Sequence, residues 1–316
     1  MPHLPEAKAA RPAGPCPLVG LVVDRVDWHA RDLARALRHL GAGTIPVRLQ
    51  RCELTTRSAF GVRIDGFAER LPDAVMVRSM SGGTFEAVTL RLGILHALRE
   101  LGVTVWNDAR AIERCVDKST TSFLLARAGI ATPDTWTVES RDAARAIVRR
   151  EAADAPLVLK PLFGSQGRGL RLIRHENDLP EPESVAGVYY LQRFVGVERE
   201  GFRDFRLLVS QGRVVAAMAR HAASWITNVK QGGRPMAAVV DGEANELAIR
   251  AAAAVAANFA GVDVTYDAAG RPTALEVNSM PAWSGLQKVT STSIANVLAT
   301  DLMAAIETRT RRGASV

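Results

Sequence analysis

The stretch VLKPLFGSQGRGL, residues 158–170, carries most of the information about the fold. Its apolar start predicts a buried strand that ends at Lys160. The loop that follows contains Gly164, Ser165, Gln166, Gly167 and Gly169. Backbone amides of a glycine-rich loop can turn toward phosphate oxygens, and Lys160 adds a positive charge. These residues favour a nucleotide-phosphate site, with an ordinary hairpin turn as the alternative.

Two common nucleotide-binding patterns are absent from the sequence. The loop lacks the GxxxxGK[ST] spacing, and no GxGxxG follows the first apolar run, where the sequence reads VVDRVDW (22–28). A dinucleotide is therefore not expected.

Upstream of this stretch, short apolar runs alternate with segments of helical periodicity. The predicted strands cover 18–24, 44–49, 73–78 and 103–107, with helices over 29–40 and from near Thr84. This order is typical of a parallel sheet in an α/β fold. An alanine-rich helix is expected over about 243–260. We predict a proline-rich disordered tail at 1–17, an N-terminal α/β domain at 18–110, and two further parts at 111–190 and 191–312.

A second informative stretch is GVDVTYDAAGRPTALEVNSMP, residues 261–281. It predicts two strands joined by a turn at 267–270. Strand alternation places Glu276 and Asn278 on one face and Leu275 and Val277 on the other, and Asp263 can face the same way as Glu276. Carboxylate and amide oxygens suit Mg²⁺. The alternative is a solvated acidic face of a strand.

A third stretch, residues 204–233, predicts two strands joined at Gln211-Gly212. Asp204 and Arg206 share a face of the first strand, and Arg220 lies at the end of the second. Arginine binds phosphate or carboxylate through a planar two-point fork, so both arginines are candidates to hold a transferred phosphoryl group. A surface Asp/Arg ladder is the alternative.

An anion site is also predicted in the first domain. VRSMSGGT, residues 77–84, follows a buried strand and precedes a helix. Arg78 and Ser79 lie at the carboxyl end of that strand, where ligands of open parallel sheets gather. The alternative is a capped helix beside a surface arginine.

Composition excludes several classes of protein. The chain has 316 residues, a formal net charge of +7 and 47% apolar residues, which fits about two globular domains of roughly 150 residues. The first apolar run is far shorter than the roughly 20 residues that span a bilayer. Basic residues do not form runs, and few aromatic residues accompany them, so no nucleic-acid partner is expected. Three widely spaced cysteines indicate a reducing compartment, and we expect a soluble cytoplasmic protein without membrane contact.

Together these pieces resemble one enzyme family. The chain resembles the ATP-grasp carboxylate–amine ligases and, within them, the RimK-like α-L-glutamate ligases, over about 18–306. The pieces that carry the likeness are Asp117-Lys118, Lys160-Pro161 with FGSQGRG, LQRF (191–194), Asp204 and Arg206, Thr227-Asn228, and Asp263 with Glu276-Val277-Asn278. RAIERCVDKSTTSFLLARAGIATP (110–133), KPLFGSQGRG (160–169) and SWITN (224–228) look most like tetrahydromethanopterin:glutamate ligases.

The resemblance implies an ATP-grasp fold behind a Rossmann-like, pre-ATP-grasp N-terminal domain. It implies that Lys118 and Lys160 contact ATP phosphates under a lid at 164–169. It also implies an adenine hinge at 191–194, which includes Gln192, Arg193 and Phe194, with Asp204 beside the ribose. Members often have Gln-Glu before the aromatic residue of the hinge, and here Arg193 takes the place of the glutamate.

The same resemblance implies the rest of the site. Two Mg²⁺ or Mn²⁺ ions would bind Asp263, Glu276 and Asn278, while Arg206, Arg220 and Asn228 would stabilise an acyl phosphate and a tetrahedral intermediate. The expected substrates are ATP, L-glutamate and an anionic coenzyme precursor, and a homo-oligomer, a dimer or a tetramer, is expected.

Three other functions remain open at this point. The chain can be a glutamate ligase for a protein C-terminus or another small acid, an ATP-binding regulatory protein without turnover, or an RNA-binding module. Intact lysines, Arg206 and all three metal ligands argue against the regulatory protein, and the scarcity of aromatic residues argues against RNA.

Overall fold

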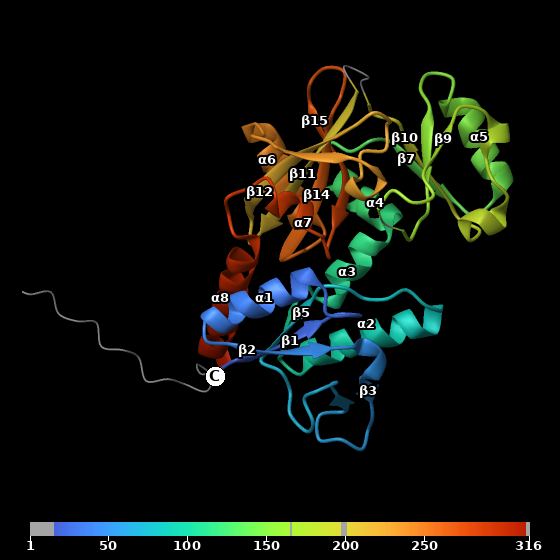
Figure 1. Cartoon of the computed structure of the whole chain (residues 1–316). Helices are drawn as coiled ribbons and strands as arrows, with labels where there is room; N and C mark the ends of the chain where they lie inside the picture. The colour runs from blue at the N-terminus through green and yellow to red at the C-terminus, as the bar shows by residue number, and fades with distance from the viewer. Residues whose placement is uncertain (1–15, 165, 197–200, 314–316) are drawn as a thin grey trace, which may run out of the picture.

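The computed structural model of the chain describes residues 16–164, 166–196 and 201–313. Three parts are visible in Figure 1: an N-terminal lobe, a small central lobe and a larger lobe built on the C-terminal sheet. Of the predicted tail, residues 1–15 lie outside the described residues. Among the described residues, no helix is long and apolar enough to cross a membrane.

The N-terminal lobe has a four-stranded parallel sheet in the order β2-β1-β5-β6. Its strands are β1 (Leu18–Val22), β2 (Gly43–Val47), β5 (Ala74–Val77) and β6 (Thr104–Trp106), and its helices are α1 (Trp28–His39) and α2 (Phe85–Glu100). All four predicted strands and both predicted helices are confirmed. The sequence interpretation missed a two-stranded hairpin of β3 (Glu53–Leu54) and β4 (Val62–Arg63).

Two consecutive helices, α3 (Ala109–Val116) and α4 (Lys118–Arg127), connect this lobe to the rest. Asp117 caps α4 by accepting hydrogen bonds from the backbone N–H groups of Ser119 and Thr120 at 2.8 and 3.2 Å. That cap fixes where α4 begins, and so it places Lys118 at the first position of the helix.

The central lobe is a sheet in the order β7-β10-β8-β9 with α5 packed on it. Its elements are β7 (Thr135–Val138), α5 (Arg141–Glu151), β8 (Leu157–Lys160), β9 (Arg171–Ile173) and β10 (Tyr189–Arg193). The expected boundary at 190/191 falls inside β10, which pairs with β7 and β8 and therefore belongs to the central sheet.

The C-terminal sheet is antiparallel, in the order β13-β12-β11-β14-β15. Its strands are β11 (Phe202–Ser210), β12 (Arg213–Ala222), β13 (Arg234–Ala237), β14 (Phe259–Tyr266) and β15 (Pro272–Asn278), and α6 (Gly242–Ala254) covers one face. The predicted turns at 211–212 and 267–270 are confirmed. The expected helix over 243–260 was too long, because Phe259 and Ala260 are fully buried at the start of a central strand.

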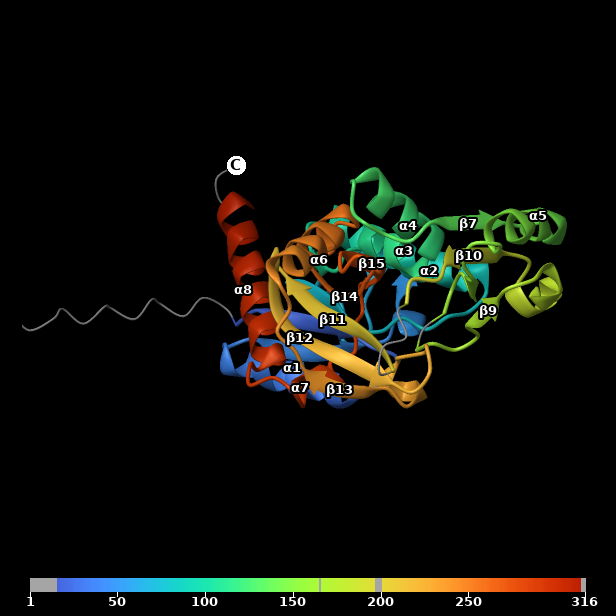
Figure 2. The same ribbon diagram turned by 90° about the horizontal axis from the view of Figure 1, so that it is seen from above.

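The end of the chain returns to the N-terminal lobe. After α7 (Ser284–Gln287), the long helix α8 (Ile294–Gly313) lies beside α1, as Figures 1 and 2 both show. Buried Leu298 and Leu302 share one core with Leu33 and Leu37 of α1 and with Val19 of β1. One face of the N-terminal sheet is therefore closed by the last residues of the chain, a long-range pairing that sequence periodicity does not show.

Candidate functional site

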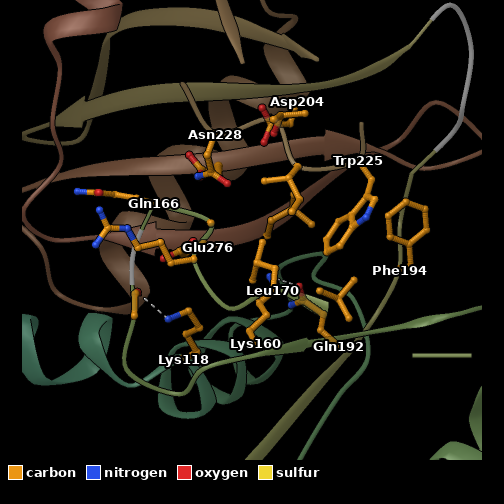
Figure 3. Close-up of a pocket in the computed structure, with 18 of the residues that line it drawn as sticks. Lys118, Lys160, Gln166, Leu170, Gln192, Phe194, Asp204, Trp225, Asn228 and Glu276 are labelled. Carbon is orange, nitrogen blue, oxygen red and sulfur yellow. Dashed lines mark hydrogen bonds between the residues drawn. The ribbon is translucent and has the colours of Figure 1, made fainter. Parts of the chain in front are cut away.

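The candidate site lies where the central sheet faces the C-terminal sheet (Figure 3). A cavity of about 120 Å³ is lined by Lys118, Val158, Lys160, Pro161, Gly164, Gln166, Gly167, Arg168, Leu170, Gln192, Arg193, Phe194, Val195, Asp204, Arg220, Trp225, Ile226, Thr227, Asn228, Asp263, Leu275 and Glu276. Sites for small molecules usually enclose roughly 300–1,000 Å³, so a nucleotide requires this cavity to widen.

Two lysines reach the cavity from different elements. Lys118, buried at the start of α4, donates hydrogen bonds to the carbonyl oxygens of Leu162 and Gly164 at 3.2 and 3.0 Å. Lys160, at the end of β8, donates to Oε1 of Gln192 at 2.5 Å. Burial lowers the pKa of both lysines, and the nearby carboxylate of Glu276 opposes that shift. Both cations have neutral oxygen partners, which an incoming phosphate can replace.

Four charged side chains form a continuous chain of ion pairs, in which Asp204, Arg220 and Asp263 line the cavity and Arg206 lies behind Asp263, outside the lining. Arg206 donates to both carboxylate oxygens of Asp263, each at 2.7 Å. Arg220 donates to the same carboxylate at 2.9 Å and to both oxygens of Asp204 at 2.7 and 2.5 Å. The register explains the contact, because Arg206 stands opposite Asp263 and Asp204 stands opposite Arg220.

These pairs set the charge state of the buried groups. Burial alone would raise the pKa of Asp263, but the two arginines overcome it and hold the pKa at about 2. Burial likewise opposes the charge on Arg220, and the two carboxylates outweigh it and raise its pKa. The alternative of a solvated surface ladder is wrong, because Asp204, Arg220 and Asp263 are each less than a tenth exposed.

Glu276 reaches the cavity, and the predicted alternation holds from Glu276 to Asn278 but is wrong at Leu275. The pairing of β14 with β15 shifts between Asp263 and Val264, so that Asp263 stands opposite Glu276 and Val264 opposite Ala274. This bulge inserts one residue and turns Leu275 to the same cavity as Glu276, whereas Val277 stays in the core beneath α6. Asn278 stands opposite Gly261 and is not among the lining residues.

The carboxylate and amide oxygens of the site can hold a hard divalent cation only together with water and phosphate oxygens. Among the described residues, no cluster of three or more His, Cys, Asp or Glu side chains is arranged to hold a metal ion. Asp263 and Glu276 supply two carboxylates, and Asn278 can add an amide oxygen. Mg²⁺ commonly takes one or two carboxylates and fills its other positions with water and phosphate oxygens, so the residues fit such an ion once Asp263 shares an oxygen.

The glycine-rich loop lies against the opposite side of the site. Gly167 has φ +71°, and a Cβ atom there would overlap Oδ1 of Asn228 and lie 3.0 Å from Cγ2 of Ile226. Gln166 also lines the cavity, while Ser165 lies outside the described residues. The loop after β8 therefore touches the 224–233 loop, and only glycine fits that contact without a shift.

At the predicted hinge, Gln192 is buried and Phe194 borders the cavity. The side chain of Arg193 is held by Glu151 at 2.6 Å and by Asp134 at 3.3 Å. Its ion pairs lie within the central lobe, which gives this arginine a structural role.

Arg78 and Ser79 lie apart from this cavity. Arg78 is 6% exposed, donates to the carbonyl oxygen of Pro281 at 2.9 Å and stacks over Trp283 at 4.3 Å. Its Nε and Nη1 atoms are buried and have no hydrogen-bond partner among the residues that the structure describes, and burial lowers its pKa to about 10. The alternative of a surface arginine is therefore wrong. Ser79 accepts a hydrogen bond from the backbone N–H of Asp24 at 3.0 Å.

Several lining residues were missed by the sequence interpretation. Arg168, Leu170, Trp225 and Leu275 all border the cavity without having been assigned a role. Arg168 and Trp225 stand inside the quoted motifs FGSQGRG and SWITN, so their neighbourhood was recognised. Leu275 had no signal, because strand alternation pointed it the other way.

Known proteins resemble this chain in sequence, in agreement with the resemblance seen in its motifs. A RimK-like ATP-grasp domain matches residues 115–302. The chain is 32% identical to tetrahydromethanopterin:alpha-L-glutamate ligase of Methanosarcina acetivorans, over 77% of this chain and 80% of that protein. It is 34% identical to the protein of the same name from Methanocaldococcus jannaschii, over 72% of this chain and 77% of that protein.

Solved structures share the fold. The ATP-grasp ligase PsnB with its minimal precursor has a TM-score of 0.70 at 23% identity, covering 90% of this chain and 98% of PsnB. The D-cycloserine synthetase DcsG has a TM-score of 0.66 at 20% identity, covering 92% of this chain and 99% of DcsG. The chain therefore belongs to the RimK-like ATP-grasp family and is a ligase that forms carbon–nitrogen bonds.

Proposed function

We propose that the protein is an ATP-dependent α-L-glutamate ligase that joins glutamate to a carboxylate of an anionic coenzyme precursor similar to tetrahydromethanopterin. The observation that supports this most is the cavity itself, which combines Lys118 and Lys160 with the ion-paired Asp204, Arg220 and Asp263; Arg206 pairs with Asp263 from outside the lining. The names of the relatives are the reason for proposing glutamate and a pterin as substrates.

The reaction requires activation of a carboxylate, which is a poor electrophile near neutral pH. In the proposed sequence, a carboxylate oxygen of the acceptor attacks the γ-phosphorus of ATP, the bond to the β-phosphate breaks, and ADP and an acyl phosphate form. The nitrogen of glutamate then attacks the acyl carbon and loses a proton, and inorganic phosphate leaves. No protein nucleophile is needed.

Each predicted residue has a role in this sequence. Lys118 and Lys160 hold phosphate oxygens, and residues 164 and 166–169 cover them and exclude water. Asp204, placed beside the ribose by the resemblance, also orients Arg220. Arg206, Arg220 and Asn228 stabilise the charge on the acyl phosphate and the tetrahedral intermediate.

Asp263, Glu276 and Asn278 would hold two Mg²⁺ or Mn²⁺ ions, which when bound neutralise charge on the phosphates. Gln192, Arg193 and Phe194 form the adenine hinge. Arg78 and Ser79 bind the anionic acceptor, which requires the covered guanidinium of Arg78 to become accessible.

The cellular setting is part of the proposal. Cys16, Cys52 and Cys115 are all free. A reducing cytoplasm suits free thiols, and a homo-oligomer remains a prediction.

A screen for ADP release tests the proposal. The protein is incubated with ATP, Mg²⁺ or Mn²⁺ and L-glutamate against a panel of pterin, furan and peptide acceptors. We expect ADP release only when glutamate and one small anionic acceptor are both present, and no release from the Glu276→Gln variant. ADP release with peptides alone would indicate that the acceptor is a protein C-terminus. ATP binding without turnover on any acceptor would favour a regulatory protein.

A further inference from the structure

The cavity has two chemically different ends. Lys118, Asn228 and Glu276 lie at one end, and Phe194, Trp225 and Leu170 lie toward the other, as Figure 3 shows. Val158, Val195 and Leu275 add further apolar side chains to the lining. A nucleoside triphosphate has the same asymmetry, with a polyanion at one end and a flat aromatic base at the other. The base is therefore expected at the end that holds Trp225.

Trp225 packs against Phe194, which in turn packs against Phe202. Its ring meets Phe194 edge to face, with the centroids 6.1 Å apart at 87°, and Phe194 meets Phe202 in the same manner at 6.4 Å. Such edge-to-face pairs fix the orientation of an aromatic ring. Trp225 is half-buried, so part of its indole remains uncovered.

The loop that carries Trp225 is tightly closed. The backbone N–H of Gly233 donates to the carbonyl of Asn228 at 3.1 Å, and a Cβ atom at Gly233 would overlap the carbonyl of Thr227. The same loop brings Asn228 against Gly167. The segment between β12 and β13 thus reaches both ends of the cavity.

We propose that Trp225 stacks on the base of the bound nucleotide and supplies much of the affinity for the nucleoside part of ATP. This inference rests on the proposed ATP-dependent function and assigns the base-binding side chain within it. Stacking of a base on an aromatic side chain contributes about 1–3 kcal/mol. A large part of the selectivity for ATP over a bare phosphate chain then comes from this residue.

Calorimetric titration of the purified full-length chain with two probes tests the assignment. The probes are ATP and inorganic tripolyphosphate, each with Mg²⁺. Trp225→Ala is expected to weaken ATP binding about tenfold, within the range for loss of one stacked base, and to leave tripolyphosphate binding unchanged. Trp225→Phe keeps a ring and is expected to restore most of the ATP affinity.

Trp28→Ala is the matched control, because Trp28 is 41% exposed on α1 and does not line the cavity. Unchanged ATP affinity in Trp225→Ala would overturn the assignment. An equal loss of affinity for both probes would also overturn it, because Trp225 would then maintain the shape of the whole pocket and would not bind the base. A wild-type protein that binds tripolyphosphate but gains nothing from the adenosine part would overturn it as well. Absence of any ATP binding by the wild type would refute the proposed function itself.

Discussion

Glu276 and Asp263 are both carboxylates in the site, but their surroundings differ. Two arginines neutralise Asp263, whereas Glu276 acts on Lys118 and Lys160 through the electric field of its charge. We expect Glu276→Gln to abolish turnover while ATP binding partly survives, because the lysines still hold the phosphates. Turnover and ATP affinity measured across Mg²⁺ concentrations check this. An active variant with normal metal dependence would contradict the metal role.

The two lysines predict a dependence of ATP binding on pH. Each lysine attracts phosphate only when protonated, and burial lowers the pKa of both below the ordinary 10.5. As pH rises through these lowered pKa values the charges are lost, so ATP affinity is expected to fall at a lower pH than free lysine would dictate. Titrations from about pH 7 to 10 test this, with Lys160→Arg as the comparison, because arginine keeps its charge throughout that range. A flat profile for the wild type would refute it.

Arg78 is a buried cation whose Nε and Nη1 have no hydrogen-bond partner in the described part of the chain, an arrangement that is costly unless something offsets it. If Arg78 binds the acceptor, Arg78→Ala should raise the acceptor KM by the equivalent of roughly 1.5–3 kcal/mol and leave the KM for ATP near its original value. Arg25→Ala, an exposed arginine of the same lobe, is the control. An unchanged acceptor KM in the Arg78 variant would place the acceptor elsewhere.

At the scale of elements, the glycine-rich loop depends on its contact with the 224–233 loop. Gly167→Ala introduces a Cβ that overlaps Asn228 at a residue with φ +71°. We expect kcat to fall at least tenfold, which corresponds to an increase of about 1.4 kcal/mol in the activation free energy. Gly187→Ala separates the two causes. Gly187 has φ +76° with open space around it, so it carries the backbone strain without the clash. Equal kcat losses in the two variants would assign the effect to strain alone.

The same loop is expected to respond to nucleotide. Glycines 164, 167 and 169 give the backbone of this loop wide conformational freedom, and Lys118 donates a hydrogen bond to the Gly164 carbonyl at 3.0 Å. Amide hydrogen exchange over 163–169 is expected to slow when an ATP analogue binds. Equal exchange with and without the analogue would refute a lid.

At the scale of the whole molecule, Asn107 joins the N-terminal lobe to the C-terminal sheet. Its fully buried side chain donates to the carbonyls of Phe259 and Ser279 at 2.7 and 2.8 Å and accepts from the N–H groups of Asn258 and Phe259 at 2.5 and 3.2 Å. Asn107→Ala leaves those backbone groups unpaired, and we expect a loss of roughly 2–5 kcal/mol in the free energy of unfolding. Urea unfolding measures it, with exposed Asn296→Ala as the control. A loss no larger than that of the control would refute the role of Asn107 in joining the lobes.

Sequence alone determined the features that depend on near neighbours in the chain. Apolar runs predicted the strands of the N-terminal sheet, and short glycine-containing breaks predicted the hairpin turns. Glycines in the loop after Lys160 predicted one wall of the cavity, and the binding of phosphate there stays a prediction. These features were predictable because hydrogen bonding and periodicity within a few residues decide them.

Tertiary structure decided what those residues contact. The bulge in β15 turned Leu275 into the cavity, and the register of β11 against β12 and β14 joined Asp204, Arg220, Asp263 and Arg206 into one chain of ion pairs. Packing of α8 on α1, burial of Arg78 beneath Trp283 and the placement of Trp225 beside Phe194 were equally invisible in the sequence. Each of these contacts joins residues far apart in the chain. Strand register and the packing of the lobes fix such contacts, and local periodicity encodes neither.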